Sequence, residues 1–298
     1  MTLVLAMYDY DTEWSFDDEP AKLEGKPSGI LTIADSVITA VGKPTTKLVT
    51  SFRKTYELEI RVYEPNFNND GSLRNYLYVQ SKHNCLLSIA GSTLVAQHVL
   101  NIVTTHLGNL HYTYDFKKRE HQIIRNCQPN PLAKGRYSDW DPAESAGLLS
   151  ADYINETVIH SIRHIIDATA VDRAGDISQI GTNFLLSFQC PKNNAFYIYQ
   201  YDLSVASSGE LEIKSKKIAR DDIGIIGMSK EFYEDAKNTY LDCLQRNEKP
   251  KSRMIEFMKA AIDKVQMTSY EIDYPVIVKR TDGRKITKEL IATPTTNL

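Results

Sequence analysis

The chain has 298 residues, of which 42% are hydrophobic and 24% charged, a composition typical of a globular chain able to bury one large core or two smaller ones. Its 35 basic and 38 acidic side chains nearly balance, which excludes the strong charge excess of nucleic-acid and membrane-surface binders. No apolar run approaches the roughly 18 to 20 residues that span a bilayer, and no basic stretch precedes the first apolar residues, so we expect a cytoplasmic protein without a signal peptide.

The first hundred residues predict a series of β-strands. They are rich in β-branched and aromatic residues and are punctuated by Gly, Pro and Asn. An acidic stretch at 11–29 interrupts them and predicts a long loop or hairpin tip. Because no helical pattern separates these strands, we expect them to pair antiparallel. The predicted strands are 1–10, 30–41, 47–65, 73–80 and 85–91.

Helical periodicity follows in two segments, 92–107 and 151–169. Apolar residues recur on one face of each, and Ser92 stands where an N-cap would begin the first helix. The segment between them is polar, rich in proline and without a clear period. It is too long for a simple connection in a compact domain, so we interpret 108–150 as an insertion.

The last third of the chain combines short strands with helices. Two strands on either side of the turn sequence PKNN predict a hairpin. A short apolar strand then leads through Gly227 into a helix. The order of elements along the chain predicts an α+β fold in which two sheets face each other with the helices outside them. We expect one domain, 1–298, with insertions at about 11–29 and 108–150 and a short polar C-terminal tail. The remaining predicted elements are strands at 182–190, 195–204 and 274–283 and helices at 231–246 and 252–267.

The common enzymatic motifs GxGxxG, GxxxxGK[ST], HExxH and GxSxG are absent from the sequence. What remains is an ordered set of ordinary residues: Thr2 opens the first strand, Asp35 ends an apolar half-strand, Lys54 closes SFRK and Gly91 stands at a strand-to-helix junction. Taken singly, such residues are more often a turn former, a solvated edge residue and a tight turn than parts of a site. Thr2 adds one chemical possibility, because a terminal threonine carries both a hydroxyl nucleophile and an amine base.

The order of four short motifs resembles the proteasome-type family of N-terminal nucleophile hydrolases. These motifs are MTLVLAM at the start, IADSVIT at 33–39, SFRK at 51–54 and LLSIAGST at 86–93. The segment MTSYEIDYPVIVKR and the FRK triplet look most like the bacterial ancestral-beta-subunit branch, known as Anbu. The resemblance implies a four-layer αββα sandwich, with two antiparallel sheets between helical layers.

The resemblance also implies a catalytic role for four residues. Thr2 Oγ would attack the scissile carbonyl, with its own α-amine accepting the proton. Lys54 would favour the developing alkoxide, and Asp35 would hold Lys54 charged and oriented. The backbone N–H of Gly91 would donate to the oxyanion.

Four further positions match accessory or substrate-binding positions of that family. Ser229 and Ser269 would support the terminal amine with their hydroxyls. Thr39 would pair its backbone with an extended substrate, and Ile89 would shape the side-chain pocket. A third accessory position, an aspartate in classical β subunits, has no counterpart before Glu271.

The nucleophile is available only if Met1 is removed, because a retained methionine would acylate the amine of Thr2. Threonine is small enough for methionine aminopeptidase, so we expect removal. The insertions at 11–29 and 108–150 depart from typical members of the family and would alter subunit packing or cover the cleft.

Neither a metal nor another cofactor is expected. The four cysteines lie far apart, with no CxxC pair and no Cys/His cluster at metal-ligand spacing, so we interpret them as buried thiols. His160 and His164 stand at i, i+4 on a predicted helix, a spacing that suits a metal ion. No acidic or cysteine partner stands at matching spacing in the sequence, and solvent-facing histidines are the commoner case.

The sequence therefore predicts a threonine-type peptidase or amidohydrolase that acts on a peptide or protein substrate. It is expected to assemble into a homo-oligomer, as a ring or a helix, through its outer helices. A catalytically silent scaffold subunit is the main alternative, and an unrelated α+β binding protein is the third. The sequence does not decide whether an ATPase partner is needed.

Overall fold

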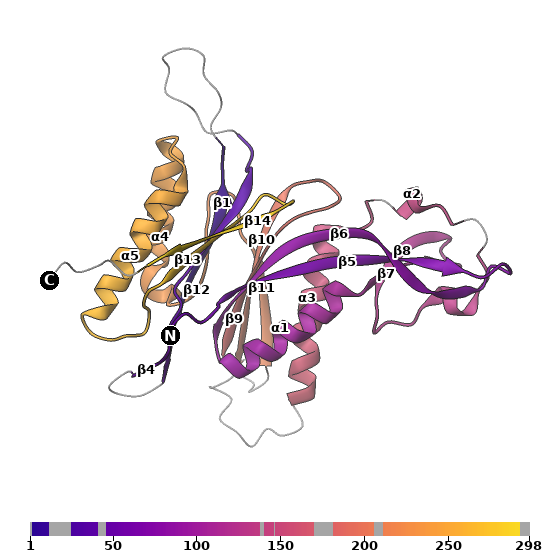
Figure 1. The fold of residues 1–298 in the computed structure, drawn as a ribbon, viewed down its shortest axis with the longest axis horizontal. Coiled ribbons are helices and arrows are strands. Elements are labelled where there is room, and N and C mark those ends of the chain that lie inside the picture. Colours follow the sequence, from indigo (N-terminus) through magenta and orange to yellow (C-terminus); the bar gives the residue numbers. More distant parts are fainter. Residues whose placement is uncertain are drawn as a thin grey trace, which may run out of the picture.

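Hydrophobic strands form two main sheets in the computed structural model, which describes residues 2–11, 25–40, 46–137, 140–145, 147–169, 181–205 and 211–292 (Figure 1). The five-stranded sheet has the order β12 (Gly224–Gly227), β1 (Leu3–Asp9), β2 (Gly29–Ala34), β13 (Val276–Thr281) and β14 (Ile286–Ile291). The seven-stranded sheet has the order β11 (Leu211–Lys217), β10 (Phe196–Val205), β9 (Thr182–Gln189), β6 (Leu73–Gly91), β5 (Thr55–Phe67), β7 (Leu110–Asp115) and β8 (Glu120–Arg125). A separate two-stranded antiparallel sheet pairs β3 (Ile38–Ala40) with β4 (Thr46–Val49).

Each main sheet carries a pair of long helices. The helices α4 (Ser229–Gln245) and α5 (Pro250–Gln266) share a core with the five-stranded sheet, and α1 (Thr93–Gly108) and α3 (Ala151–Thr169) share one with the seven-stranded sheet. Short helical turns lie at η1 (Pro131–Lys134) and α2 (Pro142–Ser145). The predicted α+β class is confirmed, and each of the four predicted helices begins and ends within two residues of its predicted bounds.

The two sheets also pack against each other. Leu185 of β9 and Ile198 of β10 belong to the same buried cluster as the residues of β1 and β2. All seven residues of β1 are consequently buried, since one of its faces meets the helices and the other meets the second sheet. This burial explains why the strand reads as a continuous apolar run rather than an alternating one.

The strands β5 and β6 are unusually long and form an arm that extends away from the two-sheet body (Figure 1). Their pairing includes register shifts near Tyr63, Pro65 and Phe67. The hairpin β7–β8 from the predicted insertion pairs alongside, with Val62 next to Leu110 in the one parallel strand pair among the described residues.

Several strand predictions were wrong in detail. The segments 73–80 and 85–91 form the single strand β6, whereas 47–65 divides into β4 and β5. The strands β7, β8 and β11 were missed, and β14 lies in what was predicted to be a polar tail. β14 is a largely exposed edge strand, so its sequence shows little of the hydrophobic alternation that marks a buried strand. Most of the predicted loop at 11–29 lies outside the described residues.

None of the helices in the described part of the chain is long and apolar enough to cross a membrane.

Candidate functional site

A buried ion pair joins Asp35 and Lys54. Asp35 directly follows β2 and Lys54 directly precedes β5, so the pair links the ends of strands from the two sheets. The Lys54 Nζ atom lies 2.6 Å from Asp35 Oδ2, and the two residues are 2% and 0% exposed. The sequence-based pairing of these residues, 19 positions apart, is therefore present in the structure.

The Asp35 carboxylate also binds the backbone beside Thr2. The Leu3 N–H donates to Asp35 Oδ1 at 2.8 Å, and the Val37 N–H donates to Oδ2 at 3.2 Å. The Asp35 N–H in turn donates to the Leu3 carbonyl at 3.2 Å. Because Leu3 is bonded in both directions, the residue before it is held at a fixed place beside the ion pair.

Burial acts in opposite directions on the two partners. It raises the pKa of the Asp35 carboxyl and lowers the pKa of the Lys54 ammonium, and in each case the opposite charge of the partner counters the effect. A lysine with a lowered pKa releases its proton more readily near neutral pH than an exposed one. Such a group suits electrostatic stabilisation and proton transfer alike.

The carbonyl of Thr2 is held from the opposite side by the start of α4. The Met228 N–H donates to the Thr2 carbonyl oxygen at 2.8 Å. Gly227 makes this approach possible, because it has φ +89° and a Cβ atom at that position would lie 1.7 Å from the same oxygen. Ser229 follows Met228 as the first residue of α4, so one predicted accessory residue lies close in the chain to the contact with Thr2.

The segment that contains Ile89 and Gly91 is bonded to the same region. The Ile89 N–H donates to the Lys54 carbonyl at 2.9 Å. The Ile89 side chain is 4% exposed and packs in the core shared with α1 and α3. Gly91 is exposed at the end of β6, with φ +110°, and its Cα lies so close to Gly181 that a Cβ atom would be 2.3 Å from the Gly181 carbonyl.

The two other predicted site residues lie in less closely linked places. Thr39 belongs to β3, and its side chain lies outside the described residues. Ser269 is half-buried just beyond α5, where its N–H donates to the Val265 carbonyl at 2.8 Å. The loop that continues from Ser269 reaches the Asp35 turn, since the Ser36 hydroxyl donates to the Pro275 carbonyl at 2.7 Å.

A second buried lysine beside the site was not singled out from the sequence. Lys279 of β13 is 3% exposed, and its Nζ donates to the Thr55 carbonyl at 3.0 Å and to Glu57 Oε1 at 2.6 Å. It thereby joins the five-stranded sheet to the beginning of β5, directly after Lys54. The signal in the sequence was a lysine inside the apolar strand VIVK, where a charge needs a partner.

Among known proteins, only solved structures match this chain, and the match concerns the fold. No protein-family model and no curated protein matches the chain. Two solved structures of Anbu from Hyphomicrobium sp. strain MC1, one of a mutant and one of Anbu itself, match with 13% sequence identity. Their TM-scores are 0.52 and 0.51, and each match covers 99% of this chain and 89% of the other chain. A helical assembly of the Anbu complex from Pseudomonas aeruginosa matches with 12% identity, covering 99% of this chain and 88% of the other, but its TM-score of 0.46 supports no inference about this chain. The chain thus shares the α+β fold of the Hyphomicrobium Anbu structures, and identities this low establish the fold alone.

Because Gly227 lies so close to Thr2, we expect its replacement by alanine to destabilise the protein more than an ordinary glycine substitution does. Gly227→Ala should lower the free energy of unfolding by about 1–2 kcal/mol for the left-handed backbone and by a further ~1–3 kcal/mol for the clash. Gly147→Ala is the matched control, because Gly147 also has a positive φ, +80°, but no atom within 4 Å of the added Cβ. Denaturant unfolding measures both variants, and equal losses would contradict the contact.

The buried ion pair predicts strong coupling between its partners. Lys54→Met leaves the Asp35 carboxylate buried without its cation and should destabilise the protein by about 3–5 kcal/mol. The double variant Asp35→Asn, Lys54→Met should lose less than the sum of the two single losses, because the uncompensated charge is gone.

Denaturant unfolding of the single and double variants measures this coupling. Lys259→Met is the control, since Lys259 pairs with Glu256 at the surface, where such pairs contribute about 0–1 kcal/mol. A Lys54→Met loss no larger than the Lys259→Met loss would contradict the interpretation of the Asp35–Lys54 pair.

Proposed function

We propose that this chain is a threonine-type N-terminal nucleophile hydrolase that cleaves amide bonds, with a peptide or protein as substrate. The observation that carries the proposal is the buried Asp35–Lys54 pair, which is hydrogen-bonded to the N–H of the residue directly after Thr2. The fold shared with the Hyphomicrobium Anbu structures supports it. We further propose that the two sheets and their helix pairs constitute the complete four-layer αββα sandwich.

In the proposed reaction, Thr2 becomes the first residue after removal of Met1. Its Oγ attacks the carbonyl carbon of the substrate while the α-amine takes the hydroxyl proton. The resulting oxyanion is stabilised by the Gly91 N–H, and the Lys54 ammonium favours the alkoxide of Thr2. Collapse of the intermediate breaks the C–N bond, the leaving amine takes the proton, and water then hydrolyses the ester on Thr2.

The remaining predicted residues have supporting roles in this proposal. The hydroxyls of Ser229 and Ser269 orient the α-amine, and the backbone of Thr39 pairs with an extended substrate. Ile89 would act from within the core as the floor of a side-chain pocket, because its side chain is almost fully buried. No cofactor takes part in these steps.

A catalytically silent scaffold is the second candidate, and the same contacts give it a specific basis. The Asp35 carboxylate fastens β1 to the beginning of β5, and the Thr2 carbonyl fastens β1 to the start of α4. Both contacts would stabilise the fold even in a subunit without activity. Chemical reactivity of the Thr2 hydroxyl distinguishes the two candidates.

The central prediction concerns that hydroxyl. Thr2→Ala should abolish labelling by a β-lactone or epoxyketone probe and lower hydrolysis of a peptide substrate by ~10⁴-fold or more, because no nucleophile remains. Thr2→Ser is the matched variant: it keeps the hydroxyl, and serine, alanine and threonine are all small enough to permit removal of Met1. It should retain labelling.

Mass spectrometry of the probe-treated variants measures the adduct directly. Labelling that survives in Thr2→Ala would place the reactive residue elsewhere. An inert wild-type protein that has lost Met1 would favour the scaffold.

We also propose that the chain forms a homo-oligomer. Leu77, Tyr78 and Val79 are successive residues of the β6 arm that are 55%, 64% and 42% exposed. Because successive strand side chains point to opposite faces, Tyr78 and Val79 place one exposed apolar side chain on each face of the arm. Such an uncovered apolar run is typical of a surface that meets another protein chain, and a second copy is the proposed partner.

Assembly should therefore depend on the arm. Tyr78→Asp should reduce the molar mass measured by light scattering after size exclusion, since it places a charge in the buried contact. Leu94→Asp is the control on the outer helix α1, where Leu94 is 83% exposed. Loss of assembly in Leu94→Asp alone would instead place the contact on the outer helices, and a monomeric wild-type protein would contradict the proposal.

A further inference from the structure

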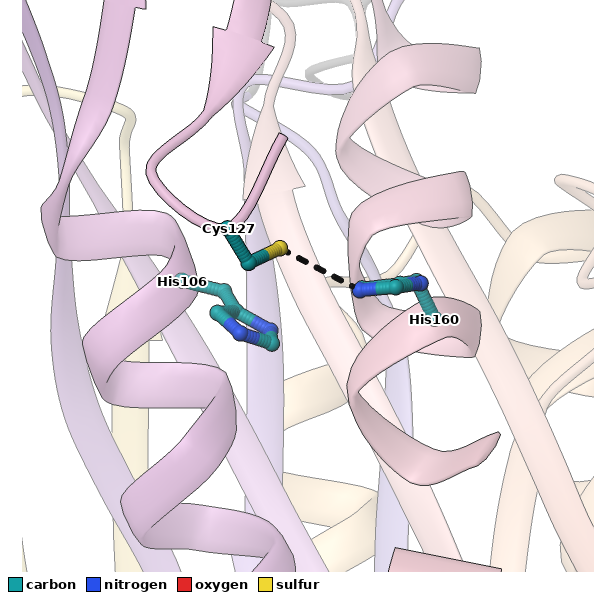
Figure 2. Close-up of side chains that lie close together, drawn as sticks. All are labelled: His106, Cys127 and His160. Atoms are coloured by element: carbon teal, nitrogen blue, oxygen red, sulfur yellow. Dashed lines mark hydrogen bonds between the residues drawn. The ribbon is translucent and has the colours of Figure 1, made fainter. Parts of the chain in front are cut away.

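Three potential metal ligands converge outside the Thr2 site (Figure 2). His106 lies near the end of α1, Cys127 lies in the turn after β8, and His160 projects from the middle of α3. One ligand atom of each lies within 4.8 Å of the other two. Cys127 Sγ and His160 Nε2 are only 3.4 Å apart.

The hydrogen bonds of His106 orient its ring for a ligand role. The Ser161 hydroxyl donates its proton to the Thr157 carbonyl at 2.7 Å, so its oxygen must accept in its 2.8 Å contact with His106 Nδ1. Nδ1 therefore carries the proton in neutral His106, and the lone pair stands on Nε2. Metal-binding histidines typically donate their second ring N–H to such a partner, which fixes the tautomer and the ring orientation.

The three ligands combine a buried histidine, His106, with an accessible cysteine, Cys127. His106 is 7% exposed, and its contact with the Ser161 hydroxyl holds the ring in place. Cys127 is exposed, so the prediction of a buried thiol was wrong for this one of the four cysteines, and its exposure gives an ion a path of entry.

We propose that His106, Cys127 and His160 bind one Zn²⁺ ion. Imidazole nitrogen and thiolate sulfur are both donors that Zn²⁺ binds in proteins, with metal–ligand distances of about 2.0–2.3 Å. His164 stands one helical turn beyond His160, with its ring centroid 6.3 Å from that of His106. It or a water molecule completes the tetrahedron.

The ion would connect three separate parts of the seven-stranded side of the molecule. It joins the two outer helices α1 and α3 to the turn that follows β8, which belongs to the base of the arm. The site is thus structural, and it is independent of the proposed hydrolysis at Thr2.

Cobalt substitution tests the site on the full-length protein. Metal-free protein titrated with Co²⁺ should develop the visible bands of tetrahedral cobalt and a near-ultraviolet thiolate-to-cobalt band, saturating at one equivalent, and Zn²⁺ should displace both. Cys127→Ser should lose the thiolate band. Cys127→Ser and His160→Ala should each weaken Zn²⁺ binding by ~100-fold or more, and Ser161→Ala by about 10–100-fold.

His98→Ala is the matched control, because His98 is exposed on the same helix as His106. It should bind Zn²⁺ as the wild type does. Zinc should also raise the melting temperature of the wild type and of His98→Ala but not that of Cys127→Ser, since only the folded site binds the ion.

A wild-type protein without a thiolate band or without stoichiometric Zn²⁺ binding would overturn the proposal. Equal Zn²⁺ affinity in the wild type and Cys127→Ser would do the same. In that case Cys127 and His160 form only a hydrogen bond. Circular dichroism of each variant separates loss of the site from loss of the fold.

Discussion

The position of residue 2 depends on the buried Asp35–Lys54 ion pair. Removing two charges from water costs several kcal/mol per ion, and the structure offsets this with a 2.6 Å contact and two backbone N–H donors to the carboxylate. One of those donors is Leu3, so the pair and the end of β1 are held as one unit. The same contacts that stabilise the fold thereby connect a lysine of lowered pKa, through Asp35, to the backbone of the residue directly after Thr2.

Local patterns predicted the helices well and the sheets only in part. The apolar period of 3.6 residues defines α1, α3, α4 and α5, because each packs one face on a sheet. The arm has no such signature, since the outer half of β6 is largely exposed and gains its structure from pairing with β5. β14 likewise depends on β13 as its partner. Pairing between distant segments leaves little trace in a single sequence.

The candidate sites show the same difference between residues linked by a local sequence motif and residues brought together only by the fold. Asp35 and Lys54 could be paired from the sequence because a known motif order connected them, whereas Lys279 reaches the site from a strand more than 200 residues further along. No cysteine lies near His160 in the sequence, so the spacing along the chain predicts no metal site there. The fold supplies Cys127 from 33 residues away and His106 from another helix. Spacing rules detect ligands within one motif and miss those that tertiary packing assembles.

The intact mass of the purified, untreated protein is the most direct test of Thr2 as the nucleophile, because every proposed step at Thr2 requires a free α-amine. We expect a mass lower than that of the full chain by one methionine residue, with Thr2 as the first residue in N-terminal sequencing. Retention of Met1 in all molecules would contradict the nucleophile role of Thr2 and leave the Asp35–Lys54 pair with a structural function alone.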